Sequence, residues 1–283
     1  MRLSESTVAV VGLGLMGGSL ALALRGKCTR LVGVARRTET IKQALRTGVV
    51  DAAVCNAQEA AAHADIVVLS TPVRHILAAI PEVTQYMRKG ALLIDLGSTK
   101  SQVVQAMNGI PQGVAAVGGH PMCGKEVGGL ESADAAIYRG ATFVLTPTER
   151  TTDEAMRLAR ELAEATGARP LLLDAERHDK AVAMVSHMPY LLASALAQAE
   201  SQARALDPVT GTLAASGFRD TSRLAASQVD MMLSILLTNR EPVKEALGLF
   251  REKLLEVERL LDTPNELEAW MSHAQGVRRE MFQ

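Results

Sequence analysis

The stretch Val8-Ala9-Val10-Val11-Gly12-Leu13-Gly14-Leu15-Met16-Gly17 decides the fold. A short apolar run is followed at once by three glycines in the spacing GxGxxG, and an alanine- and leucine-rich segment comes next. A strand, a glycine-rich turn and a helix in this order are typical of the first unit of a dinucleotide-binding domain. A glycine-rich turn without a ligand is the alternative interpretation, and the flanking strand and helix argue against it.

Each residue of this turn has an expected task. The first glycine permits the tight turn, the second lets the backbone approach a pyrophosphate, and the third allows the helix to pack closely on the strand. The start of the helix directs free N–H groups and its positive dipole end at the phosphates. The predicted cofactor contacts are therefore Gly12, Gly14, Leu15, Met16 and Gly17.

Short apolar runs recur further along the chain and alternate with helical segments. Strands are predicted at 31–34, 66–69, 91–96, 114–118, 142–145 and 169–173, and helices at positions such as 40–47, 76–87 and 152–166. Strands that alternate with helices form βαβ units and a parallel sheet. We therefore expect an α/β N-terminal Rossmann domain, doubly wound and with a mostly parallel sheet, over residues 1–174.

The residue pattern of the sequence changes at residue 175, after which no further strands are predicted. Long Ala-, Leu- and Met-rich stretches at 181–205 and 243–261 predict full helices, with Pro208 and Pro242 as interruptions. We expect an all-α C-terminal domain over residues 175–283. A helical half this apolar needs a cover, and a second copy of the chain is the simplest one, so a homodimer is expected. Wrapping of the chain's own helices is the alternative.

Bulk properties exclude several classes of function. The 283-residue chain has a net charge of −1 and only 3% aromatic residues, which argues against nucleic-acid binding. No apolar run reaches the length of a membrane span, and residues 1–7 lack the apolar core of a signal peptide. Cys28, Cys55 and Cys123 form neither a metal pattern nor a disulfide framework. We therefore expect a cytoplasmic protein with no metal, no membrane and no nucleic-acid partner.

The end of the second strand bears on the choice of cofactor. NAD-binding domains usually carry an acidic residue there, which binds the ribose 2′-hydroxyl. Here Val34 is followed by Ala35, Arg36 and Arg37, and guanidinium groups match a phosphate bidentately. NADP is therefore favoured over NAD, with two solvated surface charges as the alternative interpretation.

The turns after the third and fourth strands should line the ligand crevice. Ligands of open α/β sheets bind outside the carboxyl ends of the strands. The third strand ends in Ser70-Thr71-Pro72, and the fourth ends in Gly97-Ser98. Ser70, Thr71, Pro72 and Ser98 are therefore predicted to contact the cofactor or the substrate.

The segment Gly118-Gly119-His120-Pro121-Met122-Cys123-Gly124-Lys125-Glu126 is the most unusual of the chain. It follows a predicted strand, so His120 should lie at a carboxyl end near the crevice. A histidine there can take a proton from a substrate hydroxyl while hydride leaves the same carbon. A capped loop histidine is the alternative that residue types alone leave open.

Four segments together resemble the prephenate and arogenate dehydrogenase family. The segment at 119–129 resembles its GHPMxGxExxG signature, and residues 95–100 resemble its D-x-x-S-x-K turn. His178-Asp179 with Ser186-His187-Met188-Pro189 resembles its HD…SHLP stretch, and residues 216–223 read SGFRDTSR, as in the family. The matches run in the family's order from Val8 to about Asn239.

The resemblance implies a role for each matching residue. His120 would be the catalytic base on the ring 4-hydroxyl, and Ser98 would orient that hydroxyl beside the nicotinamide. The substrate site would include Arg223 on a carboxylate, His187 in the pocket wall, Glu126 at the pocket mouth and Asp220 near the side chain that distinguishes the two substrates. Without the motif, His178 and His187 would be interpreted as satisfied core histidines.

The implied reaction is oxidative decarboxylation, which yields tyrosine from arogenate or 4-hydroxyphenylpyruvate from prephenate. Met232 stands where some prephenate-specific members carry tryptophan, and the Arg-bearing turn is similar to that of cyanobacterial-type arogenate dehydrogenases. Arogenate and prephenate both stay open as substrates. The alternatives are a prephenate-specific NAD enzyme, a β-hydroxyacid dehydrogenase, whose catalytic-lysine context Lys180 does not match, and a non-catalytic NADP-binding sensor.

Overall fold

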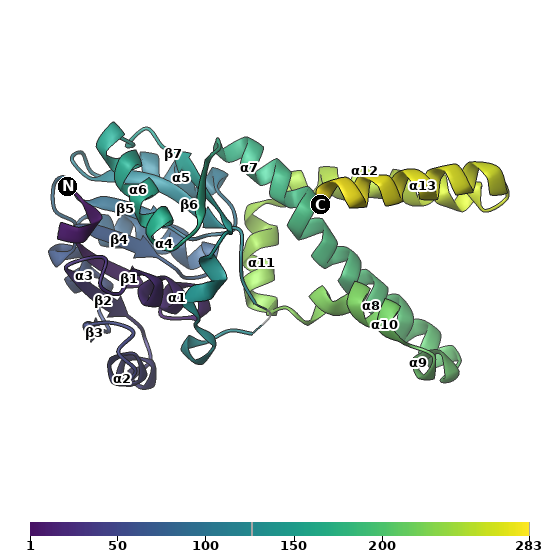
Figure 1. The fold of residues 1–283 in the computed structure, drawn as a ribbon, viewed down its shortest axis with the longest axis horizontal. Coiled ribbons are helices and arrows are strands. Elements are labelled where there is room, and N and C mark those ends of the chain that lie inside the picture. Colours follow the sequence, from purple (N-terminus) through teal and green to yellow (C-terminus); the bar gives the residue numbers. More distant parts are fainter. Residues whose placement is uncertain (126, 283) are drawn as a thin grey trace.

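The computed structural model describes residues 1–125 and 127–282. Figure 1 shows a sheet domain flanked by helices and, beyond it, a helical part that extends away from the sheet. The expected order of an α/β domain followed by an all-α part is confirmed.

One sheet of eight strands forms the centre of the first domain. Its order is β3-β2-β1-β4-β5-β6-β7-β8, and all neighbours are parallel except β6 and β7. The strands are β1 (Thr7–Val11), β2 (Arg30–Val34), β3 (Ala52–Val54), β4 (Ile66–Leu69), β5 (Leu92–Asp95), β6 (Ala115–Pro121), β7 (Thr142–Pro147) and β8 (Arg169–Leu172). The chain runs outward from β1 in one direction and returns to continue from β4 in the other, so the switch point of this doubly wound sheet lies between β1 and β4.

Helices cover both faces of the sheet. They are α1 (Leu15–Leu24), α2 (Thr38–Arg46), α3 (Ala57–His63), α4 (Val73–Thr84), α5 (Ser101–Asn108) and α6 (Asp153–Ala165). Alternate residues of β1 point to opposite faces: Val8 and Val10 pack in a core with α1 and α6, whereas Ala9 and Val11 pack in a second core with α3, α4 and α5. Because both faces of β1 are buried from Val8 to Val11, its sequence is apolar over these four residues.

Two details of the sheet differ from the sequence-based expectation. The strand β3 was not expected, since three residues at a sheet edge leave too short an apolar run to recognise. His120 was expected to follow its strand but lies within it, because β6 continues to Pro121 and pairs antiparallel with β7 up to Phe143. The side chain still lies at the carboxyl end of the parallel part of the sheet.

The helical part begins with α7 (Ala175–Val182) and continues through a π-helix (Ala183–His187) into α8 (Met188–Leu206). The remaining elements are α9 (Val209–Thr212), α10 (Ser216–Ser222), a 3₁₀ turn (Arg223–Ala226), α11 (Val229–Thr238), α12 (Arg240–Leu260) and α13 (Pro264–Met281). The single helix expected at 181–205 is therefore wrong in detail. Pro189 has no N–H to donate, and the wider π-turn before it accommodates the lost hydrogen bond.

The helical part has a small core of its own. The buried apolar residues that form this cluster are Ala183, Met188, Val243 and Ala246. In Figure 1 α8 with α10 forms one arm, α12 with α13 forms a second, and α11 lies against the sheet domain. No helix among residues 1–125 and 127–282 is both long and apolar enough to cross a membrane.

Candidate active site

The glycine-rich turn at residues 12–17 forms a cradle at the switch point of the sheet. Gly12 has a φ of +105°, and a Cβ there would lie 2.5 Å from the carbonyl oxygen of Ser70. A Cβ on Gly17 would lie 2.0 Å from the carbonyl oxygen of Gly12, whereas a Cβ on Gly14 would meet nothing within 4 Å. Two glycines are thus required by packing, and the third leaves open the space that a pyrophosphate needs above the first turn of α1.

Ser70 lies directly beside this cradle. Its amide donates to the carbonyl oxygen of Val11 (2.8 Å), which holds the end of β4 against the end of β1. Its Oγ is buried, with no hydrogen-bond partner among the described residues. A buried hydroxyl without a partner next to an open backbone cradle fits a polar ligand such as a dinucleotide. Thr71 and Pro72 continue this edge, with Pro72 preceding α4.

Arg36 and Arg37 follow the end of β2, next to the cradle. The amide of Gly12 donates to the carbonyl oxygen of Val34 (2.9 Å), so the turn and the end of β2 are adjacent. Both arginine side chains are exposed. An exposed pair of guanidinium groups one strand away from a pyrophosphate cradle fits the place of the adenosine ribose.

The buried carboxylate of Asp95, the last residue of β5, ties together the segments that carry Ser98 and His120. Its Oδ2 accepts from the amide of Gly97 (2.7 Å), and its Oδ1 accepts from the amide of Gly119 (3.0 Å). Asp95 also forms a fully buried ion pair with the ammonium group of Lys100. Ser98 and His120 are therefore held on neighbouring, braced segments.

His120 belongs to a buried cluster that both parts of the chain build. Its Nδ1 lies 2.8 Å from Nε2 of His178, and Nδ1 of His178 lies 2.8 Å from Oδ1 of Asp179. The carboxylate of Asp179 also accepts from the amides of Lys100 (2.7 Å) and Ser101 (2.8 Å) at the start of α5. Because His178 and Asp179 lie on α7, the cluster joins the sheet domain to the helical part.

His187, at the end of the π-helix, lies in the same region. Asn239 donates from Nδ2 to the carbonyl oxygen of Asp179 (2.8 Å) and lies 3.1 Å from Nδ1 of His187. Nε2 of His187 is buried without a hydrogen-bond partner among the described residues. Since Asn239 supplies the proton at Nδ1, the neutral ring carries its own proton on Nε2, where it can donate to a ligand.

The electrostatics of the cluster favour neutral imidazoles. Burial lowers the pKa of His120 well below its usual 6.5, and His178, Lys100 and His187 act in the same direction. Burial lowers the pKa of His187 to about 4, although the Asp179 carboxylate opposes it. A neutral histidine has a lone pair for a substrate proton, so His120 is present in its basic form at neutral pH.

Two further expected substrate residues belong to the helical part of the chain. Asp220 and Arg223 are exposed on the arm formed by α8 and α10, and Asp220 pairs with Arg219 at 3.3 Å. Among the described residues, no hydrogen bond or ion pair joins Asp220 to the His120 cluster. Glu126 lies outside the described residues.

The cluster also contains five residues to which the sequence analysis assigned no role. These are Asp95, Lys100, His178, Asp179 and Asn239. Two signals for these residues were available in the sequence. One is the adjacent His178-Asp179 pair, since a carboxylate beside a histidine often orients it, and the other is the D-x-x-S-x-K turn, which begins with Asp95 and ends with Lys100. Asn239 acts through contacts between distant segments, which spacing along the chain does not reveal.

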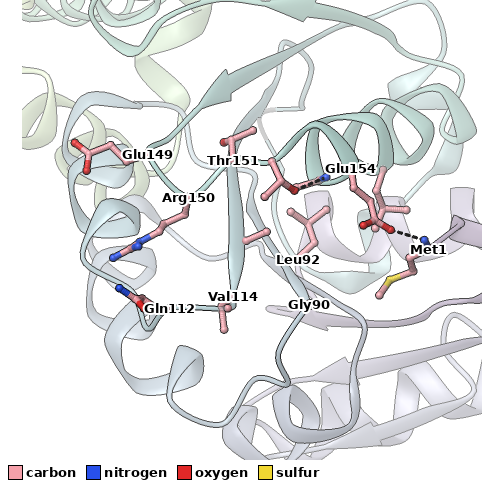
Figure 2. A pocket seen from close by; sticks show the side chains of 14 residues that line it. Met1, Gly90, Leu92, Gln112, Val114, Glu149, Arg150, Thr151 and Glu154 are labelled. Atoms are coloured by element: carbon pink, nitrogen blue, oxygen red, sulfur yellow. Dashed lines mark hydrogen bonds and ion pairs between the residues drawn. The ribbon is translucent and has the colours of Figure 1, made fainter.

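A separate surface cavity lies at the opposite edge of the sheet (Figure 2). Its lining includes Leu92 and Ala115, the first residues of β5 and β6, together with Arg150 and Glu154. The glycine-rich turn, Ser70 and Ser98 follow the carboxyl ends of their strands. The cavity is therefore distinct from the candidate active site.

Comparison with known proteins gives matches over both parts of the chain. A family model described as the nucleotide-binding domain of prephenate dehydrogenase matches residues 20–172, and one described as its dimerization domain matches residues 174–273. A prephenate dehydrogenase of Bacillus subtilis is 33% identical over 266 residues, which cover 92% of this chain and 70% of that protein.

Solved structures agree with these matches. Prephenate dehydrogenase from A. aeolicus, in complex with hydroxyphenyl propionate and NAD+, has a TM-score of 0.89 and 28% identity, covering 99% of this chain and 100% of that one. The structure of Synechocystis arogenate dehydrogenase matches with a TM-score of 0.82 and 30% identity, and the match covers 97% of this chain and 99% of that one. Since the family models and these relatives extend over both the sheet domain and the helical part, the chain belongs to the prephenate and arogenate dehydrogenase family.

Proposed function

We propose that this protein catalyses the NADP-dependent oxidative decarboxylation of arogenate to tyrosine, of prephenate to 4-hydroxyphenylpyruvate, or of both. The proposal depends on one observation, the state of His120. Its imidazole is buried and neutral at the carboxyl edge of the sheet, and Asp95 holds its segment next to the segment of Ser98. The family to which the chain belongs supplies the reaction type.

The residues divide the chemical work as follows. Nε2 of His120 accepts the proton of the ring 4-hydroxyl, and Ser98 orients that hydroxyl. Bound NADP supplies the acceptor for the hydride that leaves C4. The C1–carboxyl bond then breaks, CO2 leaves, and the electron pair of that bond enters the ring, which becomes aromatic; the ring oxygen takes the proton back from His120 and leaves as a phenol. His187 donates from Nε2 to an oxygen of the substrate, and Arg223 binds a carboxylate bidentately. We assign Asp220 to discrimination between the side chains of the two substrates.

The preference for NADP rests on Arg36 and Arg37. Both are exposed after β2, at the edge where the ribose phosphate would lie, and the sequence of residues 35–38 contains no acidic residue. Replacing both with serine should raise KM for NADP at least tenfold while leaving KM for NAD within about twofold, since each good charged contact contributes about 1.5–3 kcal/mol. Equal kcat/KM values for NAD and NADP in the unmodified protein would reject the preference.

Steady-state kinetics with crossed reactants test the proposal as a whole. Arogenate and prephenate are each offered with NADP and with NAD, and reduced cofactor is followed by absorbance. We expect the highest kcat/KM with NADP and one or both of these substrates. Turnover of neither substrate, despite cofactor binding, would reject the enzyme in favour of a cofactor-binding sensor.

A prephenate-specific, NAD-dependent enzyme is the second candidate, because an A. aeolicus relative was solved with NAD+. Met232, buried on α11 where some prephenate-specific members carry tryptophan, speaks against it. The same crossed experiment separates the two, since this candidate requires that arogenate be inactive and that NAD be preferred.

We also propose a homodimer formed through the helical part, with the domain division at residues 174/175, between β8 and α7. The helical part matches a dimerization domain, and its own core is small. Large apolar side chains lie exposed on its arms, among them Leu206, Leu213, Leu249, Leu254, Leu255 and Leu261. A second copy would remove this surface from water.

A further inference from the structure

The cluster around His120 forms a directed line of hydrogen bonds. It runs from the carboxylate of Asp179 to Nδ1 of His178 and from Nε2 of His178 to Nδ1 of His120, each step being 2.8 Å. Asp179 and His178 are each 1% exposed, and His120 is 9% exposed. Water therefore does not compete for these contacts, and the partners in the line determine where each proton lies.

The direction of the line follows from what each group can donate. An ionised carboxylate only accepts, so Nδ1 of His178 carries the proton that faces Asp179. In the neutral ring, Nε2 of His178 then has a lone pair and accepts from Nδ1–H of His120. The neutral ring of His120 carries one proton, so its Nε2 is left with the lone pair.

We propose that His178 and Asp179 are positioning residues that hold His120 in the tautomer whose Nε2 is unprotonated. The inference rests on the proposed role of His120 as the base, and it deepens that role by naming what prepares it. The opposite tautomer would present an N–H to the substrate hydroxyl and could not accept its proton.

The same line stabilises the charge that forms during the reaction. When the hydroxyl O–H bond breaks and the Nε2–H bond of His120 forms, the Nδ1 proton of His120 can pass to Nε2 of His178. The positive charge then lies beside the carboxylate of Asp179, and the reverse steps return the proton to the ring oxygen when decarboxylation makes it a phenolate. No other reactant is consumed.

The groups that face His120 come from three places. His178 and Asp179 lie on α7, and His187 lies in the π-helix. Asp95 is the last residue of β5, and Lys100 follows it. The ammonium of Lys100 is neutralised by Asp95, and His187 is neutral, so Asp179 is the carboxylate available to stabilise an imidazolium on His120. Its two amide contacts at the start of α5 keep it ionised and fixed.

The tautomer can be observed directly by NMR. In the protein labelled with ¹⁵N-histidine, long-range ¹H–¹⁵N spectra report which ring nitrogen carries the proton, and the chain has only six histidines. The His120→Asn variant identifies the His120 signals by their loss. We expect a protonated Nδ1 and an unprotonated Nε2 at neutral pH. A protonated Nε2 on His120 would overturn the proposal.

Two substitutions at position 178 separate positioning from folding. His178→Leu removes the acceptor, so the His120 signals should shift to a mixture of tautomers. His178→Gln keeps an amide oxygen that can accept from Nδ1–H, so it should restore the native tautomer. His63→Gln, at an exposed histidine at the end of α3, is the matched control. An unchanged tautomer in a folded His178→Leu protein would overturn the proposal, and if that variant does not fold, loss of the native tautomer in His178→Gln would do so.

Kinetics provide the second readout. We expect kcat of His178→Leu to fall about 10²–10⁴-fold with KM nearly unchanged, as for a base held in the wrong tautomer, and His178→Gln to recover at least tenfold of that loss. A fall confined to KM, or equal losses in the two variants, would contradict positioning. A failure of the proposed function can be distinguished from a failure of this inference. If the proposed function is wrong, the unmodified protein turns over neither substrate, whereas the tautomer of His120 is still decided by NMR.

Discussion

His120 shows how surroundings convert an ordinary side chain into a base. The residue type alone allows a charged or a neutral ring near neutral pH. Burial within β6 and the neighbouring His178, Lys100 and His187 remove the charged form, and Asp95 braces the strand that carries it. The outcome is a lone pair at a defined position, supplied by residues from both parts of the chain.

The pH dependence of kcat/KM should reveal this environment. The basic form is active and the protonated form is not, so activity falls as pH drops through the pKa of His120. Since that pKa lies well below 6.5, kcat/KM should be flat from neutral pH to 6.5 and fall about tenfold per pH unit only below the lowered pKa. An acidic limb with its midpoint at or above pH 6.5 would show that His120 is not the buried base described here.

Substitutions should distinguish the proposed catalytic base, His120, from the proposed carboxylate-binding residue, Arg223. His120→Asn keeps the approximate shape of the side chain but loses the lone pair at Nε2, so kcat should fall about 10²–10⁴-fold with KM little changed. Arg223→Ala should instead raise KM strongly, because it removes a carboxylate contact. Steady-state kinetics measure both. Near-full kcat in His120→Asn would move the role of base to another residue, with His187 as the next candidate.

At the scale of single elements, the glycine-rich turn makes the sharpest prediction. Gly17→Ala places a Cβ 2.0 Å from a backbone oxygen, so the turn must shift, at a cost of about 1–3 kcal/mol and a Tm lower by several degrees. Gly14→Ala meets no atom within 4 Å, so its Tm should stay the same while its Kd for NADP rises at least tenfold. Thermal melts and cofactor titration test the pair. Equal Tm losses in both variants would show that Gly14 is a packing position.

The elements differ in how far the sequence predicted them. Uninterrupted apolar runs such as those of β1 and β4, bounded by glycine or by Ser-Thr-Pro, were predicted within a residue or two. The short β3 and the π-helix were not predicted, because their existence depends on pairing at a sheet edge and on a proline downstream. Likewise, the sequence predicted His120 but not its contact with His178, since the two residues meet only through the packing of distant segments.

At the scale of the whole molecule, exposed leucines on the two arms predict association. Light scattering at micromolar concentration should give twice the chain mass of 30.1 kDa. Leu254→Asp combined with Leu261→Asp should shift the mass toward the monomer, because each buries a charge in an apolar interface. Leu45→Asp, at an exposed leucine on α2, is the control and should leave the dimer intact. A monomeric unmodified protein would contradict the proposed assembly.

The π-helix between α7 and α8 makes chain length itself a constraint. A π-turn amounts to one residue inserted into a regular helix. Deleting a single residue from Ala183–His187 would let α7 run into α8 as one α-helix, and everything after the deletion would rotate by about 100°. His187 would leave its contact with Asn239, and the apolar side of α8 would turn away from the direction it now faces. The segment should therefore tolerate substitutions at the exposed Met184, Val185 and Ser186 but no change in the number of its residues.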